Sequence, residues 1–238
     1  MPSLRVERVS VRFGGVVALE RVDLAATPGM VTGLIGPNGA GKTTLFNVIT
    51  GLQPVSEGSV LLDGEDVTRV KAHERARRGL GRTFQRLEIF GSLSVRDNLL
   101  VAAEARKAAD PRQVVDEVLD RTGLSSLSHS KVDSLPTGTA RLVELGRALA
   151  AAPSVLLLDE PGSGLNDDET DRLGDLLLEV AADGLAVVLV EHDVELVMRV
   201  CATVHVLDFG RLIASGSPDQ VRRDEAVQAA YLGAEVPV

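Results

Sequence analysis

The residues best suited to chemistry form one run, Gly36-Pro37-Asn38-Gly39-Ala40-Gly41-Lys42-Thr43, followed by Thr44. The spacing G-x-x-x-x-G-K-[ST] is typical of a phosphate-binding loop when it joins a strand to a helix. Glycines let successive backbone N–H groups converge on phosphate oxygens, and the helix N-terminus adds partial positive charge. We expect Lys42 to neutralise the β- and γ-phosphates and Thr43 to ligate Mg²⁺. A flexible turn can match this pattern, but the flanking strand and helix favour the phosphate site.

A second group with chemical potential is the adjacent pair Asp159 and Glu160, which follows the apolar stretch 155–158. At the carboxyl end of a parallel strand, Asp159 can reach a metal beside the phosphate loop. Glu160 can polarise an attacking water as a general base. Strands that end in two solvated acids are common, so the pair gains its meaning from the loop at 36–43. Together they predict hydrolysis of a nucleoside triphosphate.

These groups need a sheet and helices to bring them together. The second half of the chain alternates short, wholly apolar stretches, which predict strands, with stretches that predict helices. This alternation is typical of a parallel sheet that is covered by helices on both faces. The predicted fold class is therefore α/β. Strands are predicted at 30–35, 154–158, 185–190 and 203–208, and helices at 42–50, 168–182 and 193–200.

Two other regions follow different patterns. Residues 3–27 predict two strands broken at Gly14-Gly15, with one slip in the alternation that is typical of a bulge, and 59–62 predicts a strand that turns at Asp63-Gly64. Residues 94 to about 152 are mostly helical. One helix is predicted to begin at Ser94, where Asp97 has capping-box spacing. A second is predicted to begin at Pro111 and end at Gly123, and a third to run over 140–152.

Composition excludes several classes of function. The chain has 238 residues with a formal charge of -9 and 3% aromatic residues, which disfavours a nucleic-acid grip or base-stacking platform. A single cysteine, Cys201, excludes an internal disulfide framework or a Cys-cluster zinc site. The longest notable apolar run has far fewer than the roughly 20 residues of a membrane span, and the N-terminus lacks the apolar core of a signal peptide. We expect a cytosolic protein whose membrane role comes through partners.

Taken with these motifs, the sequence resembles the ATPases of ATP-binding cassette (ABC) transporters over nearly its whole length. Phe84-Gln85 is similar to that family's glutamine loop, 163–166 to its dimer-crossing loop, and His192 to its switch histidine. The resemblance implies ATP and Mg²⁺ as cofactors. It also implies that Gln85 contacts Mg²⁺ and the attacking water, that His192 touches the γ-phosphate, and that Phe13 stacks on adenine.

One element departs from the family pattern. The signature Leu-Ser-Gly-Gly-Gln is here Leu135-Pro136-Thr137-Gly138-Thr139, so the serine that meets the γ-phosphate has become a proline with neither hydroxyl nor N–H. The resemblance implies a head-to-tail dimer, homo- or heteromeric, in which Thr137 and Gly138 face the ATP of the opposite chain. We hypothesise that an intact partner signature completes this chain's own phosphate site, and that the opposite site is weaker.

Within the family, the sequence is most similar to the LivG-like ATPases of branched-chain amino-acid importers. The similar stretches are 79–85, 89–90, 93–95, 98–99, 191–194 and the tail Ala230-Tyr231-Leu232-Gly233. ATPases of urea and amide importers and of lipopolysaccharide export are also similar. The implied partners are a second ATPase, transmembrane permease subunits and a solute-binding protein, with no nucleic acid. The implied location is cytoplasmic, on the inner face of the membrane.

The resemblance implies one ABC ATPase domain over 1–238. Residues 1–85 and 153–238 would form the nucleotide-binding core with its antiparallel β-subdomain, and about 86–152 an inserted helical lobe. The alternatives are a regulatory subunit that hydrolyses ATP weakly, favoured by the altered signature, and an exporter ATPase. DNA-repair and translation-factor ABC proteins carry tandem cassettes, zinc modules or long coiled coils, which this sequence lacks.

Four other patterns receive simpler interpretations. Asp208-Phe209-Gly210 matches a kinase tripeptide but lacks a catalytic loop and predicts a turn between two strands. The histidines at 73, 129 and 205 are too scattered for metal ligation, and Cys201 is interpreted as a small core residue. The basic stretch 69–82 predicts a solvated helix face or, alternatively, a contact with a membrane subunit or anionic lipids.

Overall fold

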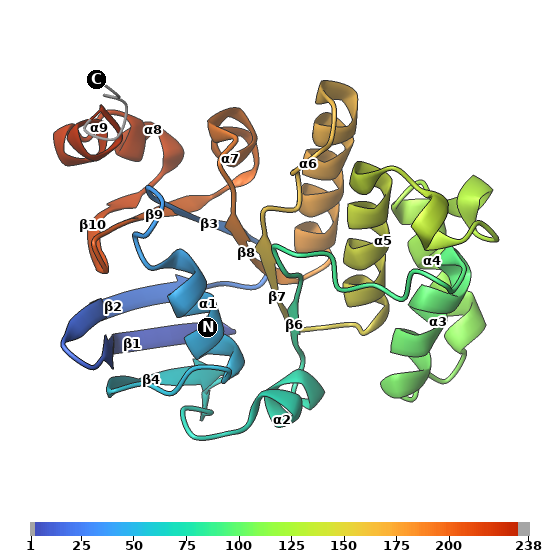
Figure 1. The fold of residues 1–238 in the computed structure, drawn as a ribbon, viewed down its shortest axis with the longest axis horizontal. Coiled ribbons are helices and arrows are strands. Elements are labelled where there is room, and N and C mark those ends of the chain that lie inside the picture. Colours follow the sequence, from blue (N-terminus) through green and yellow to red (C-terminus); the bar gives the residue numbers. More distant parts are fainter. Residues whose placement is uncertain (1–2, 233–238) are drawn as a thin grey trace.

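The computed structural model describes residues 3–232, which form two sheets and their covering helices (Figure 1). The first sheet is antiparallel with the order β2-β1-β4-β5. The register between β1 and β2 shifts between Val6 and Val9, which confirms the single slip predicted from the alternation, and it shifts twice more before Arg12. The strands are β1 Leu4–Phe13, β2 Val16–Ala26, β4 Glu57–Leu62 and β5 Glu65–Asp66.

The second sheet has the order β10-β9-β3-β8-β7-β6, and every neighbouring pair is parallel except β10 with β9. All residues of β3, β7 and β8 are buried, as a sheet covered on both faces requires. This confirms the predicted α/β fold class. The strands are β3 Val31–Ile35, β6 Leu80–Arg82, β7 Val155–Asp159, β8 Ala186–Val190, β9 Thr203–Asp208 and β10 Arg211–Gly216.

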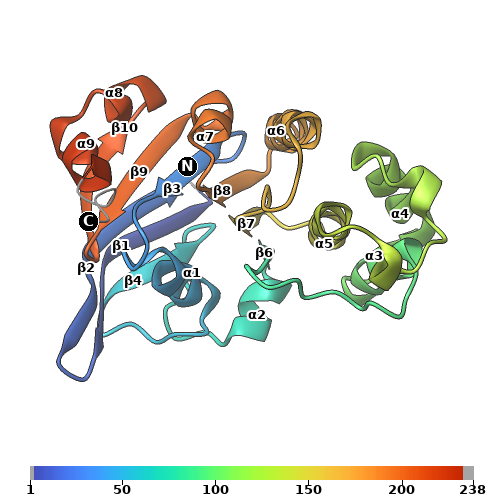
Figure 2. The same ribbon diagram turned by 45° about the horizontal axis from the view of Figure 1, so that its top comes forward.

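Two hydrophobic cores fill the two faces of this parallel sheet. On one face, Leu34, Leu157 and Val188 pack with α1 (Lys42–Thr50) and the antiparallel sheet. On the other, alternate residues of the same strands, such as Leu156 and Leu189, pack against α6 and α7. Figure 2 shows α1 on one side of the sheet and α6 and α7 on the other. The helices are α6 Asp167–Ala182 and α7 Val194–Val200.

The helical region has a core of its own and lies at one end of the molecule, on the right in Figure 1. Its helices are α3 Val95–Ala105, α4 Pro111–Arg121 and α5 Thr137–Ala150, with 3₁₀ turns at Ser125–Leu127 and Val132–Ser134. The Ser94 hydroxyl accepts from the Asp97 N–H, as its spacing predicts. The predicted start of the third helix at residue 140 was wrong. Thr-Gly-Thr is a weak helix former, but Pro136 fixes φ at -56° and Gly138 packs closely on Gly164, so the helix begins earlier.

The basic stretch 69–82 is not one solvated helix face, so that prediction was wrong. The helix α2 spans only Ala72–Arg77, and Arg75 is 2% exposed. Its guanidinium donates to the carbonyls of Val48 and Ile49, which lie in the last turn of α1. The side chain of Arg82 is also largely enclosed, at 6% exposure. Two of the six cations therefore serve the interior, which removes them from any membrane-facing patch.

The C-terminal part closes the fold. Asp208-Phe209-Gly210 joins β9 to β10 as the predicted turn, and Cys201 at the end of α7 is buried, also as predicted. The last helices are α8 Pro218–Arg222 and α9 Glu225–Leu232. Gly233 of the tail motif lies outside the described residues. None of the helices within residues 3–232 is long and apolar enough to span a membrane.

Candidate nucleotide site

The loop between β3 and α1 is a close-fitting glycine turn. Gly36, Gly39 and Gly41 all have positive φ, at 152°, 81° and 109°. A Cβ on Gly36 would lie 2.0 Å from the carbonyl oxygen of Leu207, and one on Gly41 would lie 2.9 Å from that of Ala18. Neighbouring strands β9 and β2 therefore leave room only for glycine, which holds the loop in one shape.

Lys42, the first residue of α1, points back into this loop. Its Nζ donates to the carbonyl oxygens of Gly36 at 2.5 Å and Pro37 at 3.1 Å, and the residue is only 8% exposed. Burial lowers the pKa of Lys42, while the charges of Glu160 and Asp159 oppose that shift. The ammonium group is thus enclosed by the loop where a phosphate would need a counter-charge.

Most of the predicted site residues line one cavity of about 280 Å³. This volume suits a polyphosphate tail better than a whole nucleotide. Phe13 does not line the cavity; it ends β1 and is 49% exposed. Thr137 and Gly138 do not line it either. The lining residues are Asn38, Gly39, Ala40, Gly41, Lys42, Thr43, Thr44, Gln85, Asp159, Glu160, Val190 and His192.

Asp159, the last residue of β7, is held by the neighbouring strand β6. Its Oδ2 lies 3.2 Å from Nη2 of Arg82, and its backbone N–H donates to the Thr83 hydroxyl at 3.2 Å. Burial raises the pKa of Asp159, and the Arg82 cation opposes that shift. Sequence reasoning placed Arg82 in a solvated basic stretch and missed this contact; its position just before Thr83-Phe84-Gln85 was the available signal.

Glu160 and His192 meet because β7 and β8 are paired, with Asp159 opposite Val190. Glu160 has a positive φ of 53°, a strained angle for a residue with a side chain. Its Oε1 lies 3.0 Å from Nε2 of His192. The strained turn thus directs a carboxylate into the cavity beside an imidazole, a geometry that suits proton transfer from water.

Glu191 is a further buried carboxylate that sequence reasoning did not assign. It accepts the backbone N–H of Gly162 at 2.6 Å and of His192 at 3.1 Å. Burial raises the pKa of Glu191, and these two donors oppose the shift. A Cβ on Gly162 would lie 2.9 Å from Oε1 of Glu191. Glu191 therefore links the strand that carries His192 to the turn that follows Glu160.

The backbone around Gln85 is held by α5. Arg141 donates to the carbonyl oxygens of Phe84 at 2.8 Å and Gln85 at 2.5 Å. Glu144 accepts the N–H groups of Phe84 and Glu88, both at 3.3 Å. Arg141 and Glu144 are buried and three residues apart on the helix, a spacing that could have pointed to this contact. The helix that starts at the altered signature thus also holds the glutamine loop.

The signature residues themselves lie against the loop that follows Glu160. A Cβ on Gly138 would lie 2.8 Å from the Gly164 carbonyl oxygen and 2.8 Å from Cδ2 of Leu165. Pro136 occupies the N-cap position of α5 without a side-chain capping bond. These residues do not line the chain's own phosphate cavity.

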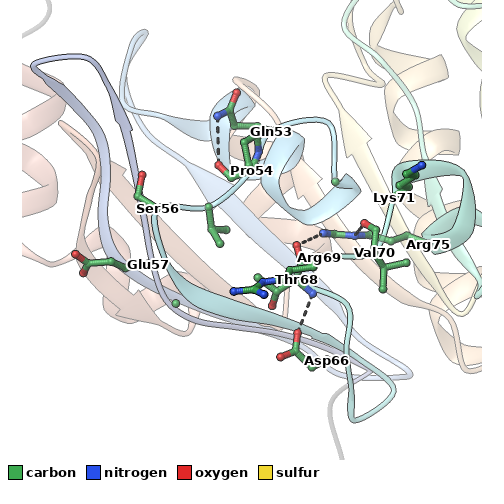
Figure 3. A pocket seen from close by; sticks show the side chains of 13 residues that line it. Gln53, Pro54, Ser56, Glu57, Asp66, Thr68, Arg69, Val70, Lys71 and Arg75 are labelled. Carbon is green, nitrogen blue, oxygen red and sulfur yellow. Dashed lines mark hydrogen bonds between the residues drawn. The ribbon is translucent and has the colours of Figure 1, made fainter.

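A larger cavity, of about 800 Å³, lies between the end of α1, β4 and the segment before α2 (Figure 3). Its charges are mixed, since Glu57 and Asp66 line it together with Arg69 and Lys71. Its buried cation, Arg75, is already engaged by backbone carbonyls. No residue of the loop at 36–44 lines it, so it is separate from the phosphate site.

The donors around the smaller cavity fit a nucleotide with its metal. The Thr43 hydroxyl and the Asp159 carboxylate both line it, and both are the oxygen ligands that Mg²⁺ prefers. Within residues 3–232, no group of three or more His, Cys, Asp or Glu side chains could hold a metal. A site with only one or two protein oxygen ligands holds Mg²⁺ together with phosphate oxygens. The glycine loop at 36–41, which lies beside these two ligands, is suited to hold that phosphate.

A parallel sheet, a phosphate loop between strand and helix, and a strand that ends in carboxylates beside that loop define a phosphate-loop nucleotide-binding protein. Residues 19–163 match the ABC transporter family, and residues 211–237 match the branched-chain amino acid ATP-binding cassette transporter family.

Relatives match over nearly their full length. The lipopolysaccharide export ATP-binding protein LptB of Haemophilus influenzae is 35% identical over 236 residues, and the branched-chain amino acid transport ATP-binding protein LivG of Escherichia coli K12 is 36% identical over 250; each comparison covers 98% of both chains. The crystal structure of the ADP conformation of an ABC transporter's ATP-binding cassette is 32% identical, with a TM-score of 0.88 over 98% of this chain and 99% of that one. The chain belongs to the ABC transporter family, as an ATP-binding ATPase subunit.

Proposed function

We propose that this chain binds MgATP at residues 36–44 and hydrolyses it to ADP and phosphate, with Glu160 as the general base. The observation that carries the proposal is that one cavity collects Lys42, Asp159, Glu160 and His192, with Glu160 and His192 3.0 Å apart. Such a cavity supplies charge compensation, positioning and a proton acceptor, which are the main requirements of phosphoryl transfer.

Each side chain receives one role in this proposal. Lys42 and the loop amides hold the β- and γ-phosphates, and Thr43 and Asp159 hold Mg²⁺, which neutralises charge on the phosphate oxygens. Gln85 and His192 sense the γ-phosphate. Phe13, whose ring is half exposed at the end of β1, stacks on adenine.

The proposed working unit is a head-to-tail dimer with a second ABC ATPase. Thr137 and Gly138 would then face the ATP of the partner chain. Because Pro136 offers no hydroxyl, we expect the site that depends on this signature to hydrolyse ATP more slowly. A partner with an intact signature would complete the faster site on this chain's own loop. We also propose that 86–152 is the helical lobe of one domain over 1–238.

The permease would contact a groove of about 350 Å³ between β6, α3 and α5. Phe90 and Val101 line this groove and are 47% and 41% exposed, so the groove presents two large apolar side chains to a partner. Arg147 lies over the Phe90 ring at 5.4 Å. A permease bound in this groove would lie next to the glutamine loop. It would also hold the chain peripherally on the cytoplasmic side of the membrane.

Phosphate release by the purified complex tests the activity. We expect Lys42→Ala to abolish productive ATP use, and Glu160→Gln to retain nucleotide binding while turnover stops. Undiminished phosphate release by Glu160→Gln would exclude Glu160 as the base. A complex that binds ATP but scarcely hydrolyses it, with or without the partner, would favour a regulatory subunit. If Glu160→Gln and the same change in the partner reduce phosphate release equally, the two ATP sites of the dimer are not unequal.

For the solute, we propose a branched-chain amino acid or a related small polar molecule, imported with the help of a solute-binding protein. The match of residues 211–237 and the 36% identity to LivG support this choice. The 35% identity to LptB supports lipopolysaccharide export as the second candidate. ATP-dependent leucine uptake by vesicles that hold the complex and its permeases would support import. Release of lipopolysaccharide from the same vesicles without leucine uptake would exclude it.

A further inference from the structure

Arg82 connects three elements around the phosphate site. It ends β6, and its side chain is only 6% exposed. Its guanidinium bonds Asp159 of β7 through Nη2 at 3.2 Å and the Oδ1 of Asn47 in α1 through Nη1 at 2.7 Å. A planar guanidinium can hold both partners at once in fixed directions, which a lysine ammonium cannot.

The same guanidinium also contacts the glutamine loop. It lies 4.6 Å from the ring centre of Phe84, the residue before Gln85, and 5.5 Å from that of Phe46 in α1. The next residue along, Thr83, accepts the backbone N–H of Asp159 at 3.2 Å. The end of β6 therefore holds Asp159 by both its side chain and its backbone.

The position of this ion pair distinguishes it from an ordinary buried salt bridge. Arg82 contacts one carboxylate oxygen of Asp159, Oδ2, and Asp159 also lines the phosphate cavity. A hydrogen bond to one oxygen restricts the rotation of the whole carboxylate and so limits the directions that its other oxygen can take. Partners of this kind orient metal ligands, and their loss typically weakens metal binding 10- to 100-fold.

We propose that Arg82 is a positioning residue, which orients Asp159 toward Mg²⁺ and ties that carboxylate to the glutamine loop through Phe84. The inference rests on the proposed nucleotide site at residues 36–44. It assigns no chemical step to Arg82, which acts only through Asp159. It predicts that the contribution of Mg²⁺ to nucleotide affinity depends on the shape of the side chain at position 82.

The test is the affinity of the purified chain for a fluorescent ADP analogue, measured by titration with excess Mg²⁺ and again with EDTA. In Arg82→Lys, which keeps the charge but loses the planar fork, we expect the gain in affinity from Mg²⁺ to fall about tenfold. The affinity in EDTA should stay within about twofold of wild type. Arg78→Lys is the matched control, because Arg78 lies in the same basic stretch and pairs with the exposed Glu65 at 2.8 Å; both of its affinities should match wild type.

A second variant covers the case in which Arg82→Lys does not fold, as judged by circular dichroism. Asn47→Ala removes the shortest hydrogen bond from Arg82 to α1, while the 3.4 Å contact with the Thr50 hydroxyl and the ion pair with Asp159 remain, so a smaller loss of the Mg²⁺ gain is expected. Equal losses with and without Mg²⁺, or an unchanged Mg²⁺ gain in both folded variants, would overturn the inference. A wild-type chain that binds no nucleotide in either buffer would instead refute the proposed function.

Discussion

Replacing Arg141 with methionine should release the glutamine loop and destabilise the chain. Arg141 donates to the carbonyls of Phe84 and Gln85 and lies 3.6 Å from the buried carboxylate of Glu144. Methionine fills most of the same volume but donates nothing. The substitution therefore leaves two loop carbonyls without these donors, and it leaves the buried carboxylate of Glu144 with one nearby cation, Arg147, in place of two.

The expected cost follows from that geometry. Hydrogen bonds from a charged donor contribute about 1.5–3 kcal/mol each, and removing one partner of a buried ion pair costs about 3–5 kcal/mol in all. We expect Arg141→Met to lower the free energy of unfolding by about 3–5 kcal/mol, which for a chain of this size lowers Tm by about 6–20 °C. Adding Glu144→Gln should recover about 1–3 kcal/mol of the free energy of unfolding, since the buried charge that has lost Arg141 is then removed.

Urea unfolding of both single variants and the double variant measures this coupling. Hydrogen exchange at 84–88 should quicken in Arg141→Met, and the ATPase rate should fall because Gln85 is no longer held. Arg5→Met is the control: its partner Glu7 is on the surface, so stability should change by less than about 0.5 kcal/mol. A double variant that loses the sum of the single losses, with unchanged exchange at 84–88, would refute the reasoning.

Three further predictions concern the loop, the cysteine and a buried histidine. Gly36→Ala should abolish binding of the fluorescent nucleotide and lower Tm, because its Cβ would lie 2.0 Å from the Leu207 carbonyl oxygen; a normal titration would contradict this. Burial raises the pKa of Cys201 to about 12, so iodoacetamide at pH 8 should label it only after unfolding, as read by mass spectrometry. Burial lowers the pKa of His205 from 6.5, so the unfolded chain takes up a proton that the folded chain resists, and stability falls as pH drops below 6.5. In His205→Leu, urea titrations at several pH values should show a smaller fall of the free energy of unfolding with decreasing pH. An unchanged pH dependence would exclude His205 as its source.

Much of the fold could be predicted because its signals are local. The strand β3, the loop at 36–43 and the helix α1 follow one another in sequence, so their pattern carries the geometry directly. Short apolar strands and the capping pair Ser94 and Asp97 are equally local. The start of α5 was misplaced because tight packing of Gly138 against Gly164 outweighs the weak helix propensity of Thr-Gly-Thr.

The sequence by itself determined the phosphate loop, the two carboxylates and the order of strands and helices, since spacing along the chain encodes each of them. Only the tertiary structure decided what the buried cations do. Arg82 and Asp159 are 77 positions apart, and Arg141 and Phe84 are 57 apart. No periodicity links such positions, because their contact arises only when β6 pairs with β7 and α5 packs beside the loop. Burial, which turns an arginine from a solvated charge into a fixed donor, is a property of the folded chain.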